Sequence, residues 1–174
     1  MKDPRSLSSG RDKGLTDSRA YNLIWMGRWL ERAENMARTL DAAALTAMQA
    51  GLKRKAFNAT LKPIGAAWGV SAEGQANGVP ALIKDDPASS IYRSLARARD
   101  NANEVGPLEL IRAINAGLGE LEQLKALPQT PEEVHRLMTS VLTGLQVVYK
   151  VIEDRWFHRE AMSEEEIYRQ FVNQ

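Results

Sequence analysis

With 174 residues, the chain is long enough to form one domain with a substantial hydrophobic core. Hydrophobic residues make up 44% and charged residues 26%, and a net charge of only +1 argues against nucleic acid or anionic membranes as partners. The lack of cysteine excludes disulfides, thiol nucleophiles and cysteine-ligated metals. No apolar run approaches the roughly 18 to 20 residues that span a bilayer, and residues 1–14 lack the apolar core of a secretory signal. We therefore expect a cytoplasmic protein with a disordered arm over residues 1–14.

The first long helix is expected from the N-cap Thr16 to about residue 49, where Gly51 fits a C-terminal stop. On a helical wheel its apolar residues form a broad arc that includes Tyr21, Trp25 and Trp29, while charged side chains lie opposite. An arc of this width predicts a helix that is covered on two sides.

Residues 52–86 are rich in glycine and alanine and contain two prolines. We expect a short helix near residues 54–61 and then a long irregular connection, a kind of segment that is often functional or mobile. Asp86 before Pro87 is a helix-start signal for the next helix, which should end at Gly106.

The remaining elements follow at short intervals. A helix is expected over residues 108–127, before Pro128, and the sequence Thr-Pro-Glu-Glu at residues 130–133 is a capping box that opens another long helix. Ser163 with Glu166 forms a second capping box and predicts a last helix over residues 163–174. No stretch alternates with the period of a strand. The chain is therefore predicted to be all-α, an antiparallel bundle of about five helices in a single domain over residues 15–174.

The stretch "YNLIWMGRWLERAENMARTLD" resembles the opening helix of the bacterial alpha-E domain family, whose signature is approximately W-x-G-R-x-x-E-R-A-E-x-x-A-R. The matching positions are Trp25, Gly27, Arg28, Glu31, Arg32, Ala33, Glu34, Ala37 and Arg38. The later stretch "DDPASSIYRSLARARDNANEV" resembles the family's N-P-x-S-I…A-R-E-N-A-R segment, with Asp100 and Asn103 as departures, and "LIRAIN" fits the family's next helix.

The family's domain is roughly twice as long and contains a second G-R-x-x-E-R-A helix. Residues 162–172 can be laid on residues 15–25 without a gap, and "AMSEEEIYRQFV" resembles the start of the family's second half. The resemblance therefore implies that this chain corresponds to the first half of an alpha-E domain.

The charged residues of the first helix have two interpretations. Arg28, Glu31, Asn35 and Arg38 share one polar face, where Arg28–Glu31 and Glu34–Arg38 have the spacing of weak ion pairs. They form either a solvated face or a site for an anionic ligand. Arg32 lies beside the tryptophans at the edge of the apolar arc, so we expect its guanidinium to be buried and to be stacked or hydrogen-bonded.

Three residues of later helices complete the candidate polar cluster. Arg99 and Asn101 flank the apolar arc of their helix, and Asn115 sits at an arc edge of the next helix, so a polar network inside the bundle is expected. By contrast, Arg93, Arg97, Asp100 and Glu104 are expected to face solvent.

Signals for catalysis are few. His135 and His158 are predicted to lie on one helix, 23 residues or roughly 35 Å apart, too far to share a metal. The E-x-x-H spacing of a dimetal bundle occurs only once, from Glu132 to His135, whereas such a site needs two, and no G-K-[ST] of a phosphate-binding loop is present. We expect no metal site and no cofactor.

Two classes of function remain open. The resemblance implies a helper or interaction domain in a bacterial peptide- or amide-bond-forming system, because family members typically accompany ATP-grasp ligases and transglutaminase-like proteases, which are the expected partners. The residues themselves suggest a ligand-binding or enzymatic bundle that holds an anionic peptide or acyl group, because arginine forks suit carboxylates. A plain scaffold is a third possibility. The helper function is preferred because the sequence shows no nucleophile, metal set or phosphate loop.

A homodimer is also expected. Apolar residues cover much of the first helix and recur near the C-terminus, at Ile167, Tyr168, Phe171 and Val172. In the longer relatives a second signature helix would cover such surfaces, and here a second chain would take its place. In the alternative, residues 52–86 fold back over the bundle and leave a monomer.

Overall fold

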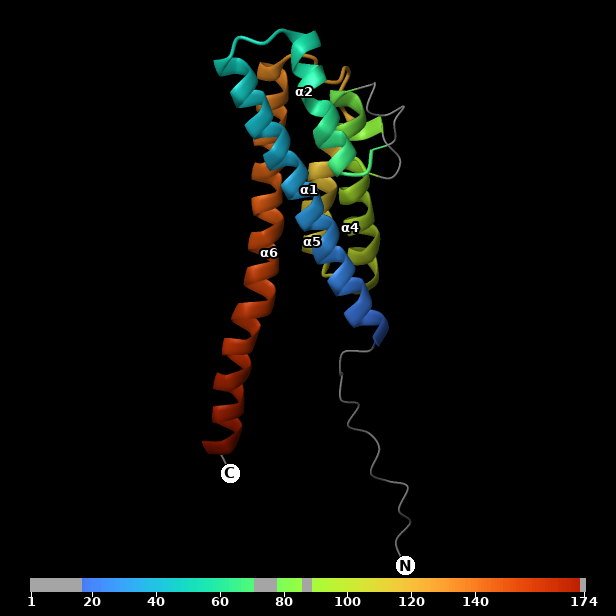
Figure 1. The fold of residues 1–174 in the computed structure, drawn as a ribbon. Coiled ribbons are helices and arrows are strands. Elements are labelled where there is room, and N and C mark those ends of the chain that lie inside the picture. Colours follow the sequence, from blue (N-terminus) through green and yellow to red (C-terminus); the bar gives the residue numbers. More distant parts are fainter. Residues whose placement is uncertain (1–16, 71–77, 86–88, 173–174) are drawn as a thin grey trace, which may run out of the picture.

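The computed structural model describes residues 17–70, 78–85 and 89–172, and within them it shows five α-helices, one π-helical segment and no strand. These elements are α1 (Asp17–Gln49), α2 (Arg54–Ala67), the π-helical segment η2 (Ala81–Asp85), α4 (Ile91–Val105), α5 (Leu108–Glu122) and α6 (Pro131–Val172). Figure 1 shows α1 and α5 running in one direction and α2, α4 and α6 in the other. The predicted antiparallel all-α bundle is confirmed. The predicted N-terminal arm over residues 1–14 lies outside the described residues.

Helix α1 is the centre of the bundle and packs against α4 on one side and α6 on the other, as its wide apolar arc predicted. Its buried residues are Met26, Leu30, Ala33, Met36, Ala37, Leu40, Ala44 and Ala47. Half of these are alanines, and such small side chains allow neighbouring helices to approach closely. Helix α5 closes the bundle by packing against α4 and α6.

The beginning of α1 differs from the prediction. Tyr21, Ile24 and Trp25 are 61%, 58% and 37% exposed, although Tyr21 and Trp25 belong to the apolar arc. The position of a residue on the helical wheel shows that it belongs to the apolar face, but it does not show whether a neighbouring helix covers that turn.

The segment after α1 is more regular than predicted. Helix α2 does not end near residue 61 but continues through Pro63 to Ala67. Proline removes one hydrogen-bond donor from a helix, yet Phe57, Leu61 and Gly65 bury one face of α2 on both sides of it, and this packing holds the helix together. Further on, the buried segment η2 forms where an irregular connection was expected.

Two helix ends were also placed wrongly. Helix α4 begins at Ile91, where the side chain of the N-cap Ser90 accepts a hydrogen bond from the backbone N–H of Arg93, whereas the expected start at Asp86–Pro87 lies outside the described residues. Helix α5 ends at Glu122 and not at residue 127. The leucines that continue its apolar pattern belong instead to the connecting loop, where they pack against the core.

The capping box that opens α6 is confirmed. The Thr130 Oγ1 atom accepts from the backbone N–H of Glu133 at 3.3 Å, and Glu133 Oε2 accepts from the N–H of Thr130 at 3.2 Å. The second capping box at Ser163 is wrong, because α6 continues without a break to Val172. Serine is tolerated inside helices, and neither proline nor glycine occurs in residues 145–172. None of the described helices is long and apolar enough to cross a bilayer.

Candidate functional site

A pocket of about 290 Å³ opens beside the middle of α1, next to the residue that follows α2. It is lined by Trp25, Arg28, Trp29, Glu31, Arg32, Asn35 and Trp68. Four of these residues, Arg28, Glu31, Arg32 and Asn35, belong to the candidate cluster found in the sequence. They meet because positions three and four apart lie on one face of a helix.

Arg32 connects α1 to the segments on either side of the undescribed residues 71–77. Its Nη2 atom donates to the backbone oxygen of Trp68 at 2.7 Å and to Ser89 Oγ at 3.3 Å. Its guanidinium also lies over the Trp68 ring, 5.6 Å from the ring centroid. The expectation that Arg32 is stacked and hydrogen-bonded is therefore correct, and its side chain is half-buried.

The charge of Arg32 is nevertheless not neutralised by any described residue. Its hydrogen bonds go to a carbonyl and a hydroxyl, and no carboxylate of the described chain forms an ion pair with it. Its Nε atom is buried and has no hydrogen-bond partner among the described residues. A buried N–H without an acceptor destabilises the folded state by roughly 1–3 kcal/mol. The guanidinium of Arg32 is therefore incompletely hydrogen-bonded.

One wall of the pocket is an aromatic stack held by a second arginine. The rings of Trp25 and Trp29 are stacked, with centroids 5.8 Å apart. On Trp29 the guanidinium carbon of Arg97 from α4 lies 4.5 Å from the ring centroid. The prediction that Arg97 faces solvent is thus wrong, because its planar cation gains more from the indole face than from full hydration.

The remaining polar residues of the pocket are exposed. Arg28 and Glu31 have the spacing of an ion pair but form none. Asn35 is also exposed, and among the described residues no side-chain hydrogen bond engages its amide. Two arginines and one glutamate line the pocket, which gives it a formal charge of +1. The side chains of Arg28, Glu31 and Asn35 are therefore available to a ligand.

The other four candidate residues lie elsewhere. Arg38 pairs with Glu34 at 2.7 Å on the surface, and Arg99 pairs with Asp100 at 3.0 Å. Asn101 donates to the backbone oxygen of Arg97, and Asn115 is exposed on α5. The predicted polar network inside the bundle is therefore wrong. These side chains start at the edges of the apolar faces of their helices, but they point to solvent or to partners on the same helix.

Glu34 connects α1 to α6, which the wheel did not predict. Its side chain is only 24% exposed and forms hydrogen bonds with Arg38 and with the hydroxyl of Tyr149. Burial acts to raise the pKa of this carboxyl group, but the hydrogen bonds from Arg38 and Tyr149 and the charge of Arg38 outweigh it, so the pKa lies below 4.5. Burial and the bond to Glu34 raise the pKa of Tyr149.

The histidines do not build a metal centre in the described chain. His135 Nδ1 lies 2.6 Å from Asp41 Oδ1 and links α6 to α1, while the side chain of His158 lies outside the described residues. In residues 17–70, 78–85 and 89–154, no three acidic or histidine side chains gather as metal ligands would. The pair is suited to joining two helices.

Sequence reasoning missed Trp68, Ser89 and Arg97. Trp68 lies within the segment that was expected to be irregular, where no periodicity could orient it. Ser89 was assigned to the helix expected from Pro87, whereas α4 begins only at Ile91. The available signal was a tryptophan in a stretch otherwise rich in glycine and alanine. The signal for Arg97 was the arginine repeat at residues 93, 97 and 99, of which only Arg97 reaches the aromatic stack.

Comparisons with known proteins identify one family for this chain. No curated protein and no solved structure matches the chain. A family model does match, over residues 17–163, and it describes Alpha-E as a predicted alpha-helical domain with a conserved ER motif. The only Glu-Arg dipeptide in the sequence is Glu31-Arg32, at the centre of the pocket. Because the match covers most of the chain, this protein belongs to the Alpha-E family.

Proposed function

We propose that this protein binds the carboxylate of an anionic peptide or acyl group in the pocket at Glu31-Arg32. In this proposal it is a helper domain in a peptide- or amide-bond-forming system. The observation that carries the proposal is the state of Arg32: its guanidinium donates only to neutral oxygens and has no carboxylate partner in the described chain. A ligand carboxylate would supply the missing negative charge, and the planar fork of an arginine suits it.

The rest of the lining fits such a ligand. Arg28 adds a second cation at the mouth of the pocket, and the stacked Trp25 and Trp29 offer an apolar wall for the neighbouring part of the ligand. Asn35 has an amide that can both donate to and accept from a peptide bond. Glu31 repels a second negative charge nearby, so a ligand with one carboxylate at the pocket is preferred over a cluster of acids.

Binding is favoured over covalent catalysis by the composition of the pocket. The residues that line it include no hydroxyl, amine or imidazole side chain, and the carboxylate of Glu31 is the only lining group of a kind that serves as nucleophile or general base. The helper role rests on the resemblance seen in the sequence, which implies association with ATP-grasp ligases and transglutaminase-like proteases. Co-purification with an ATP-grasp ligase encoded beside its gene would support it, and a stable carboxylate complex that no such ligase recognises would contradict it.

The binding test uses two N-acetylated tripeptides ending in leucine, identical except that one has a free C-terminal carboxylate and the other a carboxamide. Calorimetric titration should show binding of the first and at least about tenfold weaker binding of the second, because a charge-assisted hydrogen bond is worth about 1.5–3 kcal/mol. Arg28→Ala should weaken binding of the carboxylate peptide. Arg38→Ala is the matched control, because Arg38 lies on the same helix outside the pocket. Equal affinity for both peptides would overturn the proposal.

A further inference from the structure

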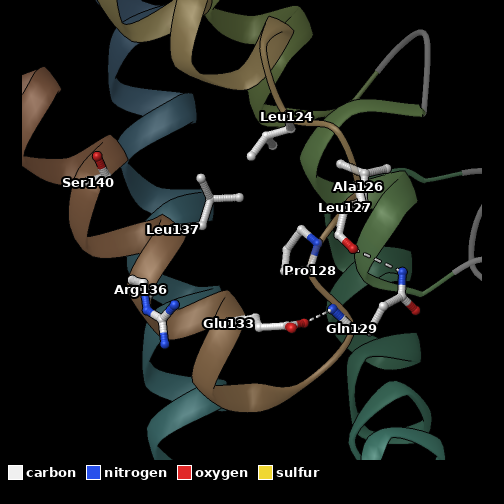
Figure 2. A pocket seen from close by; sticks show the side chains of 9 residues that line it. All are labelled: Leu124, Ala126, Leu127, Pro128, Gln129, Glu133, Arg136, Leu137 and Ser140. Atoms are coloured by element: carbon white, nitrogen blue, oxygen red, sulfur yellow. Dashed lines mark hydrogen bonds between the residues drawn. The ribbon is translucent and has the colours of Figure 1, made fainter.

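A second and larger pocket, of about 500 Å³, lies where the loop between α5 and α6 arches over the first turns of α6 (Figure 2). Its apolar surface comes from Leu124, Ala126, Leu127, Pro128 and Leu137, and its polar groups are Gln129, Glu133, Arg136 and Ser140. Leu124, Leu127 and Leu137 are only partly buried. The volume lies within the range of about 300–1,000 Å³ that is usual for small-molecule sites.

Hydrogen bonds hold the loop in place and so preform this pocket. Glu133 Oε2 accepts from the backbone N–H groups of Gln129, at 2.7 Å, and of Thr130, at 3.2 Å. The side chain of Gln129 donates from Nε2 to the backbone oxygen of Leu127 at 3.1 Å, and Pro128 between them is buried. Figure 2 shows both interactions of Gln129 along one edge of the pocket. A preformed site does not lose the entropy of ordering a loop when a ligand binds.

Two opposite charges at the pocket have unused hydrogen-bonding capacity. Both bonds to Glu133 end on Oε2, so Oε1 accepts none from the described residues, although a carboxylate offers about four acceptor sites. The guanidinium of Arg136 forms no hydrogen bond within the described chain. Backbone hydrogen bonds from Gln129 and Thr130 lower the pKa of Glu133, so its carboxylate is ionised at neutral pH.

We infer that this pocket binds a short apolar peptide with free termini, with its ammonium group at Glu133 Oε1, its carboxylate at Arg136 and its side chains on Leu124, Leu127 and Leu137. The lining combines a negatively charged hydrogen-bond acceptor, Glu133 Oε1, a positively charged donor, the guanidinium of Arg136, and an apolar surface. These three features complement a zwitterion with apolar side chains. A ligand with only one charged end would leave either Glu133 or Arg136 unmatched.

The dimensions favour a dipeptide. Residues three apart on a helix have Cβ atoms about 5–6 Å apart, and Glu133 and Arg136 carry longer side chains from such positions. Two extended residues span at most about 7 Å, so a dipeptide can place its termini against both groups. This site shares no lining residue with the pocket at Glu31-Arg32, and the inference does not rest on the function proposed for that pocket.

The experiment titrates the protein calorimetrically with four compounds: Leu-Leu, N-acetyl-Leu-Leu, Leu-Leu amide and free leucine. Leu-Leu should bind, and loss of either terminal charge should weaken binding about tenfold or more. Free leucine should bind more weakly than Leu-Leu. If leucine binds as tightly, a free amino acid is the ligand and the assignment to a peptide is wrong. N-acetyl-Leu-Leu also fits the carboxylate site proposed at Glu31-Arg32, so these two peptides are compared in the Arg28→Ala variant, where binding at that site is weakened. If they bind this variant equally, the role of Glu133 is wrong.

Two variants place the binding at this pocket. Arg136→Gln removes the cation from an exposed position, and Glu133→Gln removes the anion while its amide oxygen still accepts the capping hydrogen bonds. Each should weaken Leu-Leu binding about tenfold. The matched controls are Arg112→Gln on α5 and Glu132→Gln on α6, both exposed residues outside the lining, and both should bind normally. No binding of Leu-Leu to the wild type, or unchanged binding to Arg136→Gln, would overturn the inference.

Discussion

Arg32 of α1 donates a hydrogen bond of 2.7 Å to the backbone oxygen of Trp68, which lies 36 residues later in the chain. The same nitrogen reaches Ser89 Oγ, which in turn lies 3.4 Å from the backbone oxygen of Gly69. One arginine thus connects the central helix to the end of α2 and to the residues that precede α4. Arg32 therefore both lines the candidate pocket and holds these three segments of the fold together.

Arg32→Ala should lower the free energy of unfolding by about 1–3 kcal/mol, because it leaves the Trp68 carbonyl without its donor. The loss is smaller than for a broken buried ion pair, since no charged partner is left behind. Urea denaturation of the two proteins measures the difference. Arg38→Ala, which removes only an exposed pair with Glu34, should cost under about 1 kcal/mol. If the two substitutions lower the free energy of unfolding equally, the hydrogen bonds of Arg32 to Trp68 and Ser89 do not stabilise the fold.

Tyr149→Phe should destabilise the protein by about 0.5–1.5 kcal/mol at pH 7, because it removes the hydroxyl that bonds to Glu34. The size of the effect should depend on pH. The folded-state pKa of Glu34 is lowered, so its contribution is present above the usual carboxyl pKa and is lost as pH falls through the folded value. Denaturation at pH 7 and pH 3 should therefore show a smaller effect of the substitution at pH 3.

Glu104→Gln is a control for that experiment, because Glu104 is exposed on α4. Its effect should be small at both pH values. An undiminished effect of Tyr149→Phe at pH 3 would mean that the tyrosine stabilises the fold by packing alone and that its bond to ionised Glu34 contributes nothing measurable.

We expect a second copy of the chain to cover the exposed face at the start of α1. Ile24 is 58% exposed there, and a Cβ atom on Gly27 one turn later would meet nothing within 4 Å, which leaves room for close approach of another helix. A two-fold contact closes on itself and is the simplest way to bury such a face. Sedimentation equilibrium at micromolar concentration should show a dimer, and Ile24→Glu should dissociate it.

Leu108→Glu on α5 is the matched control, because Leu108 is a similarly exposed apolar residue, 55% exposed, on a different helix. It should leave the dimer intact. A wild-type mass of 19.3 kDa at every concentration would contradict the dimer and favour the alternative in which residues 52–86 cover the bundle. That alternative has some support in the contact between α2 and α1.

The sequence determined the architecture and one half of the candidate site. Apolar periodicity, the capping box at Thr130 and the glycine after α1 are local signals, and they located α1 and the start of α6 within a few residues. The fixed geometry of a helix also placed Arg28, Glu31, Arg32 and Asn35 on neighbouring positions of α1 before any fold was known.

Only the tertiary structure decided which of these side chains meet partners from elsewhere. Arg32 reaches Trp68, Arg97 covers Trp29 and Tyr149 bonds to Glu34, and each contact joins segments separated by tens of residues. A helical wheel gives the direction of a side chain from its own axis but contains nothing about the neighbouring helix. For that reason Arg97 was assigned to solvent, Glu34 was paired only with Arg38 on its own helix, and Arg99, Asn101 and Asn115 were assigned to an interior network. Where two helices cross is fixed by packing of the whole core.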